Sequence, residues 1–250
     1  MPTPIDENIR KQAFWLYGVI VGLAIKEALT NVLPHVFRAS KAGEMGQHMP
    51  EVVRLVLFLI LSVRFYLGAT QYFDEAFEKI HPRIGSDGTI TEENQYRRKS
   101  FGLDFIVGFF HFLVFSALAL SITYDETAPN EISNLLFPVI LLIILLYDLV
   151  WLVLNWKNDT FPLIKLWATL NTITVIFSAV CYFLVWLYYV LQGLQFNSIY
   201  AEMIALVPVF LVSVLDIAEL IIGKPVIRHF LSWLGNKITS LGSKDAPATS

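Results

Sequence analysis

The chain has one cysteine, Cys181, in 250 residues, and few charged residues. A single cysteine excludes an intrachain disulfide and any metal site built from several thiolates. Charged residues make up 16% of the chain, against about 25% in globular proteins. The net charge of −3 gives no electrostatic reason to expect a nucleic acid partner.

The sequence signatures of several enzyme classes are absent as well. There is no HExxH zinc motif, GxSxG nucleophile elbow, Walker A loop or GxGxxG dinucleotide motif. Among the five histidines only His111 falls in a long apolar segment, so a membrane haem with two axial histidines is not expected. We therefore expect no cofactor, and an enzymatic role is the less favoured interpretation.

Long apolar runs are what the sequence does have. Apolar residues make up 56% of the chain, and the mean hydropathy is +0.60. The run Leu135–Trp156 contains a single charged side chain, Asp148. At 1.5 Å per residue, a helix of this length crosses the bilayer core of about 30 Å. The chain is therefore predicted to be a membrane protein.

Six segments are long and apolar enough to span a bilayer, which predicts an all-α polytopic membrane protein with a six-helix transmembrane domain over residues 1–223. The spans are expected at about 13–33, 52–73, 101–123, 135–156, 162–191 and 199–222. Residues 13–33 lack a signal-peptide cleavage pattern, so we expect a retained first helix. A cytoplasmic loop is expected at 75–100, an amphipathic surface helix at 224–241 and a disordered tail at 242–250.

Lysine and arginine are distributed unequally between the two sides of this arrangement. Thirteen fall on the side of both termini and of the loop 75–100, and three (Arg38, Lys41 and Arg54) fall on the other. The positive-inside rule then places both termini in the cytoplasm, in a cell or inner membrane.

Each predicted span carries polar or small residues on one face, at spacings of three, four or seven. These stripes are Gly18, Gly22 and Lys26; Arg64, Gly68 and Gln71; Asp104, Gly108 and His111; Asp148, Trp151 and Asn155; Asn171, Thr174 and Ser178; and Ser213, Asp216 and Glu219. Lipid offers polar groups no partners, so the stripes are expected to face one another or water.

The ionisable groups gather in the half of the predicted bundle nearest the cytoplasm. We expect a polar cavity or ion site there, formed by Asp104, His111, Asp148, Arg64, Asn171, Asn155, Asp216 and Glu219. Arg64 is predicted to pair with Asp104 or Asp148, either as a counter-ion or only to lock the packing. Asp216 and Glu219 are close enough to Gly223 that solvation at the interface is the simpler expectation.

Three classes of function fit this pattern. The first, which we favour, is a channel or transporter for protons, cations or a small solute. The second is a structural or regulatory membrane subunit, which a dry and fully paired cluster would favour. The third is an intramembrane enzyme that uses His111 and nearby acids. Asp104, His111 and Asp148 are also a weak candidate metal site. The expected partners are the lipid bilayer and either further copies of the chain or other membrane subunits.

Overall fold

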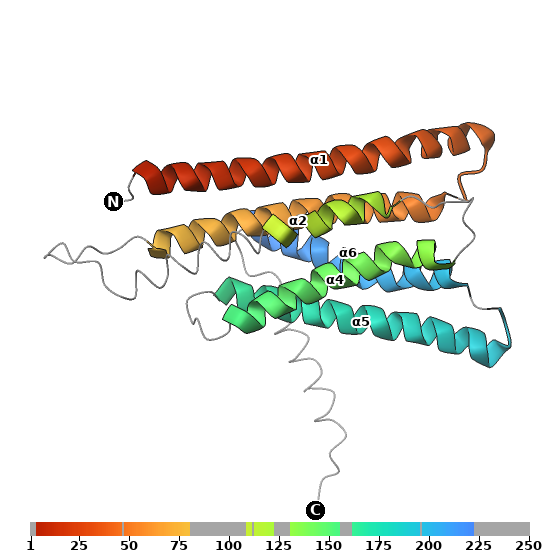
Figure 1. The fold of residues 1–250 in the computed structure, drawn as a ribbon. Helices are drawn as coiled ribbons and strands as arrows, with labels where there is room; N and C mark the ends of the chain where they lie inside the picture. The colour runs from red at the N-terminus through yellow and green to blue at the C-terminus, as the bar shows by residue number, and fades with distance from the viewer. Residues whose placement is uncertain are drawn as a thin grey trace, which may run out of the picture.

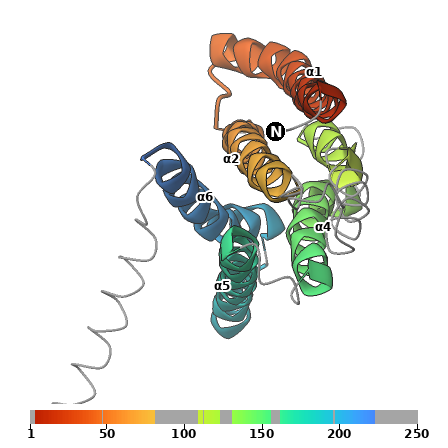
Figure 2. The same cartoon turned by 90° about the vertical axis from the view of Figure 1, so that its left-hand side faces the viewer.

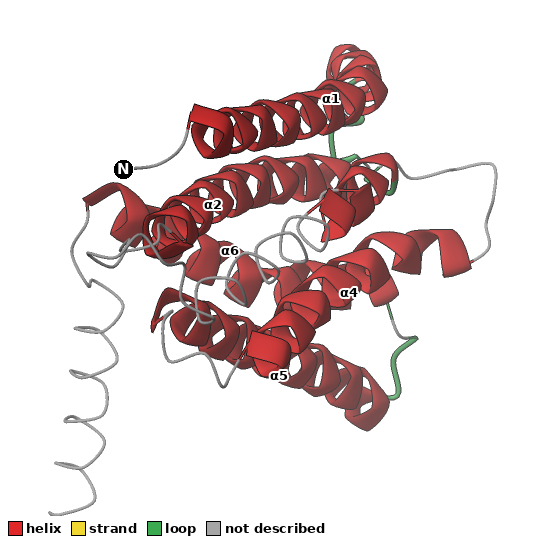
Figure 3. Ribbon diagram, turned by 60° about the vertical axis from the view of Figure 1, so that its left-hand side comes forward, coloured by secondary structure: helices red, strands yellow, loops and turns green. Residues whose placement is uncertain are grey.

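The computed structural model describes residues 4–46, 48–80, 109–111, 113–122, 131–155, 162–195 and 197–222. Every regular element within these ranges is a helix (Figure 3). The helices are α1 (Pro4–Ala42), α2 (Met49–Ile80), a segment at Phe109–Leu120, α4 (Glu131–Asn155), α5 (Pro162–Gln192) and α6 (Ser198–Ile222).

Four of these helices contain stretches long and apolar enough to cross a membrane: Phe14–Ala42, Met49–Gln71, Thr169–Gln192 and Ile199–Ile222. Shorter apolar stretches occur at Phe109–Leu120 and Leu136–Tyr147. The chain is thus a helical membrane protein, as its hydropathy predicts.

Helices α1 and α2 extend furthest beyond the predicted spans. α1 covers 39 residues, because the polar residues on both sides of the span 13–33 continue the helix. α2 continues to Ile80, into the segment expected to be the loop 75–100. The rest of that loop, the predicted surface helix 224–241 and the tail 242–250 lie outside the described residues.

Helix α2 lies in the middle of the bundle. α1 packs on one side of it and α6 on another, and α5 packs against both α6 and α4 (Figures 1 and 2). Half of the α2 span is buried, compared with 6% of the α5 span. Polar side chains on α2 are therefore the best placed to contact several other helices.

The apolar core joins α2 to the segment 109–120 and to α4. The ring of Phe115 lies 5.0 Å from that of Phe58 in a stacked geometry, and 5.6 Å from that of Phe65. Phe137 and Ile144 of α4 are fully buried in the same cluster. Burial recurs on α2 every three or four residues, the spacing that keeps one helix face against its neighbours.

Glycines end α1 and α5 and allow each chain reversal. Gly43 and Gly193 have φ values of 76° and 64°, in the left-handed region where a side chain is strained. The amide of Leu194 donates to the carbonyl of Tyr189 at 3.0 Å. This bond joins the first and the sixth residue of the turn, as in a Schellman motif. The short connection that follows brings α6 back antiparallel to α5, which sets the partners of the buried polar groups.

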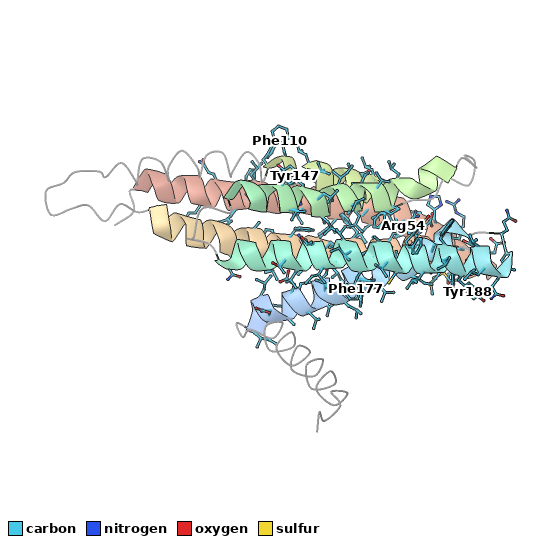
Figure 4. All side chains as sticks on the ribbon, turned by 90° about the horizontal axis from the view of Figure 1, so that it is seen from below. Arg54, Phe110, Tyr147, Phe177 and Tyr188 are labelled. Atoms are coloured by element: carbon cyan, nitrogen blue, oxygen red, sulfur yellow. The ribbon has the colours of Figure 1, made fainter. Side chains whose placement is uncertain are left out.

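Apolar side chains cover the outside of the bundle. Phe110 and Phe177 are more than half exposed and point away from the helices, and Tyr188 lies toward the same end of the bundle as Arg54 (Figure 4). In a membrane such a surface faces lipid, where an exposed apolar side chain carries no penalty.

Candidate functional site

Most buried charged side chains in the described part of the chain lie where α2 packs against α6. The buried side chains on α6 include Glu202, Leu206, Val209, Ser213 and Asp216, which are three or four residues apart and share one face. Arg54 and Arg64 of α2 face this seam, because each contacts an acid of α6. The earlier arginine pairs with the earlier acid, so α2 and α6 run in the same direction.

Arg64 is the centre of a three-helix polar contact, here called the Arg64 cluster. Its Nε donates to Oδ2 of Asp216 on α6 at 2.6 Å, and its Nη2 donates to Oδ1 of Asn171 on α5 at 2.8 Å. All three residues are at most 2% exposed. A guanidinium presents its donors in a fixed fork, so it can hold two acceptors from different helices at once.

Arg54 forms a second buried ion pair, here called the Arg54 pair. Its Nε and Nη2 donate to the two carboxylate oxygens of Glu202 at 2.8 and 2.5 Å, a bidentate geometry. The centre of the guanidinium also lies 5.5 Å from the ring of Phe137 on α4, within the range of a cation–π contact. Arg54 therefore links α2 to α6 and α4, whereas Arg64 links α2 to α6 and α5.

The two ion pairs do not have equal spacing along their helices. Arg54 and Arg64 are ten residues apart, a rise of about 15 Å, while Glu202 and Asp216 are fourteen apart, about 21 Å. The difference is close to one helical turn. The long arginine side chains and a change in the direction of α6 have to compensate for this difference in spacing. α6 contains Pro208 between the two acids.

Two buried hydroxyl groups differ from four others among the described residues. Ser62, Thr70, Ser121 and Thr174 each donate to a carbonyl one turn earlier in their own segment, at 2.7–2.8 Å. The buried Oγ atoms of Ser213 and Ser178 have no hydrogen-bond partner among the described residues. Ser213 is fully buried three residues before Asp216, so its hydroxyl lies on the face that carries the Arg64 cluster.

His111 lies among aromatic rings. Its ring is 4.8 Å from that of Phe65 in an edge-on geometry and stacks on Tyr147 at 5.4 Å. Phe65 is also 5.6 Å from the Arg64 guanidinium, so a single ring separates the imidazole from the Arg64 cluster. Asp148 directly follows Tyr147 on α4, and its side chain is outside the described part of the structure.

The structure brings together three of the eight predicted site residues: Arg64, Asn171 and Asp216. The expectation that Asp216 is solvated at the interface is wrong, since its side chain is buried against Arg64. Among the described residues the acid partner of Arg64 is Asp216. The pairing of Arg64 with Asp104 or Asp148 stays a prediction. Glu219 is half-buried one turn beyond Asp216. Asp104, and the side chains of Asp148 and Asn155, are outside the described residues.

Sequence reasoning missed the Arg54 pair. The charge count places Arg54 among the positive charges of the outer side, and Glu202 belongs to none of the predicted polar stripes. A usable signal was present, however. Each residue lies within four positions of the start of its predicted span, 52–73 or 199–222, and both spans run in the same direction. Opposite charges at equal depth on parallel spans are candidates for pairing.

An apolar groove accompanies the Arg54 pair. Its volume is about 290 Å³, and it is lined by both helices, among others by Met49, Val53 and Val56 of α2 and Met203, Val207 and Phe210 of α6. His48 and Glu51 lie beside its α2 end, where Nδ1 of the histidine is 3.0 Å from Oε2 of the glutamate. The groove has no polar lining residue and does not match the polar cavity predicted from the sequence.

A metal site finds no support in the part of the chain that the structure describes. No group of three histidine, cysteine, aspartate or glutamate side chains there could hold a metal ion. Asp104 and the side chain of Asp148, two of the three ligands suggested by the sequence, are outside that part.

No protein-family model, curated protein or solved structure matches this chain. The function proposed below therefore depends on the geometry of the buried polar groups and on their position in a membrane protein.

Proposed function

We propose that the protein moves protons, cations or a small solute across the membrane, and that the Arg64 cluster forms part of the pathway. The observation that carries the proposal is the contact of Arg64 with Asp216 and Asn171. It places an arginine, a carboxylate and an amide from three apolar helices in one buried position. This arrangement joins three of the stripes expected to form a polar site.

The energetic cost of such a cluster supports a functional role. An ionisable side chain at the centre of a membrane helix costs about 2.5–3.5 kcal/mol on insertion scales. A buried ion pair seldom recovers more than this cost, and apolar residues of similar volume often stabilise a protein equally well. Ionisable groups within membrane spans commonly mark ion, proton or substrate pathways.

In this proposal each residue of the cluster has a distinct task. Asp216 takes up the proton or contacts the cation or solute, and Arg64 is its counter-ion while the site is closed. Asn171 holds the second arm of the guanidinium, so that Arg64 keeps its orientation when Asp216 changes partner. His111, one aromatic ring away, relays protons between this cluster and the acids on neighbouring helices.

The net charge of the Arg64 cluster affects which kind of solute it can bind. Arg64 neutralises Asp216, so the described cluster has no net attraction for cations. A preference for cations therefore requires the further acids Asp104, Asp148 and Glu219, together with the amide of Asn155 as an oxygen ligand. Without them, the neutral cluster suits a proton or a small polar solute.

Flux into proteoliposomes tests the proposal. The purified protein is reconstituted and the movement of protons, Na⁺ and K⁺ is measured against empty vesicles. We expect flux above the empty-vesicle level for at least one species, and its loss in Asp216→Asn. His111→Ala and Asp148→Asn should reduce proton flux. Flux of all three ions at the empty-vesicle level would rule out an ion pathway and leave only neutral solutes.

One observation favours a second function, that of a structural or regulatory membrane subunit. The Arg54 pair and the Arg64 cluster satisfy their charges internally, as a purely structural role requires. Here the two arginines serve only to hold α4, α5 and α6 against α2. This function predicts no flux of any solute, and co-purification with one defined partner from native membranes in mild detergent.

A further inference from the structure

The seam between α2 and α6 has two unequal halves. Its second half contains Arg64, Ser213 and Asp216 and is tied to a third helix through Asn171. Its first half contains the Arg54 pair and the apolar groove. Pro208 of α6 lies between the two halves.

We propose that the first half of α6, residues 198–207, swings away from α2 about Pro208, with the Arg54 pair as the latch. This motion goes beyond the proposed transport function, because it concerns how the helices part rather than what passes between them. In this motion α2 and α6 separate along the groove.

Pro208 supplies the flexible point. Proline has no amide hydrogen, so the carbonyl of Ile204 lacks its partner four residues later, and the ring crowds that carbonyl. Sharp bends in helices occur mainly at such positions. The two acids of α6 are on opposite sides of this residue, so Glu202 can leave Arg54 while Asp216 stays on Arg64.

The groove reduces the packing that opposes separation. Closely packed side chains gain many small dispersion contacts, and exposed side chains make fewer of them. Leu57 of α2 and Leu206 of α6 are buried where they line the groove. Met49 and Val56 of α2 and Val207 of α6 line the groove and are largely exposed. The bidentate contact of Arg54 with Glu202 is therefore the principal polar restraint on this half of the seam among the described residues.

Arg54 also has a contact that does not depend on Glu202. The Arg54 guanidinium lies over the ring of Phe137, which belongs to α4 and is not part of the segment that swings in this proposal. When Glu202 departs, this cation–π contact keeps the arginine in position to receive the carboxylate again.

Distance measurements between spin labels test the motion. In a Cys181→Ala background, one double variant carries labels at Met49→Cys and Tyr200→Cys, at the start of the seam. The matched control carries them at Val63→Cys and Val214→Cys, fourteen residues further along each helix. All four positions are exposed, so labelling disturbs neither ion pair.

Glu202→Gln is expected to lengthen and broaden the 49–200 distance distribution and to leave the 63–214 distribution unchanged. Pro208→Ala, in the chain with Glu202 intact, should narrow the 49–200 distribution. Equal broadening at both positions in Glu202→Gln, or no response of the 49–200 distance to Pro208→Ala, would overturn the hinge. Neither result depends on whether the protein conducts ions.

Discussion

Arg64 of α2 and Asp216 of α6 are 152 residues apart in sequence, and their side chains meet at 2.6 Å. Together with the Arg54 pair, this contact fixes α2 and α6 as parallel neighbours. Two membrane helices can run in the same direction only if the chain between them crosses the membrane an odd number of times. Among the described residues, α5 is the one helix between α2 and α6 that is long and apolar enough to cross a membrane. The parallel arrangement fits that single crossing, and it fits equally well the three crossings of the six-span prediction.

Removing the Arg64 side chain should destabilise the protein. Arg64→Ala leaves Asp216 buried without its described counter-ion, which costs about 3–5 kcal/mol of unfolding free energy for a broken buried pair. Denaturant unfolding in detergent micelles measures this loss, with the exposed Arg38→Ala on α1 as the control. If both variants lie within about 1 kcal/mol of the parent, the range for a surface pair, the Arg64 cluster is not structurally coupled.

Lysine should not replace arginine at position 54. Its ammonium cannot form the two parallel hydrogen bonds that Glu202 accepts, so Arg54→Lys loses one charge-assisted bond worth about 1.5–3 kcal/mol. Thermal unfolding followed by circular dichroism measures the effect. Arg38→Lys, the same substitution at an exposed position, should be nearly neutral. Equal midpoints for the two variants would contradict the bidentate geometry.

The hydroxyl of Ser213 should reduce stability. A buried polar atom without a partner costs about 1–3 kcal/mol, so Ser213→Ala should raise the free energy of unfolding by about 1 kcal/mol. Ser62→Ala is the matched control, because the Ser62 hydroxyl donates to the carbonyl of Phe58 at 2.8 Å. It should be neutral or destabilising. A lower stability of Ser213→Ala would show that this hydroxyl has a partner outside the described residues.

The sidedness of the membrane arrangement is a separate prediction. The thirteen-to-three distribution of lysine and arginine places a reporter after Ser250 and cysteines within 85–95 in the cytoplasm. Cysteines at 125–132, and at Met45 in the turn after α1, should react only with reagent added outside. Labelling of 85–95 and 125–132 from the same side would contradict six spans.

The sequence predicted the helices and the polar faces because both follow from periodicity. Spacings of three and four put Asn171 and Thr174 on one face of α5, and Ser213 and Asp216 on one face of α6, and the structure buries all four. The choice of partner was less predictable. A stripe shows which face of a helix is polar, but it does not show which helix packs against that face.

Position along the chain and the count of positive charges lead to wrong expectations for Asp216 and Arg54, respectively. Asp216 was assigned to the interface by its distance from Gly223 along the chain, although a neighbouring helix can cover a side chain at any depth. Arg54 belongs to the positive charges that predict the orientation, but it also lies inside the predicted span 52–73. Both errors came from considering one helix at a time, whereas the ion pairs form between helices.

The central claim is that Arg64 and Asp216 are retained for transport rather than for stability. Arg64→Met/Asp216→Leu removes both charges and keeps apolar volume in their place, a change that is often neutral or stabilising by about 1–4 kcal/mol. Unfolding in detergent and flux in proteoliposomes are measured on the same preparation. We predict a folded protein at least as stable as the parent, with flux reduced to the empty-vesicle level. A folded double variant with the full flux of the parent would contradict the claim.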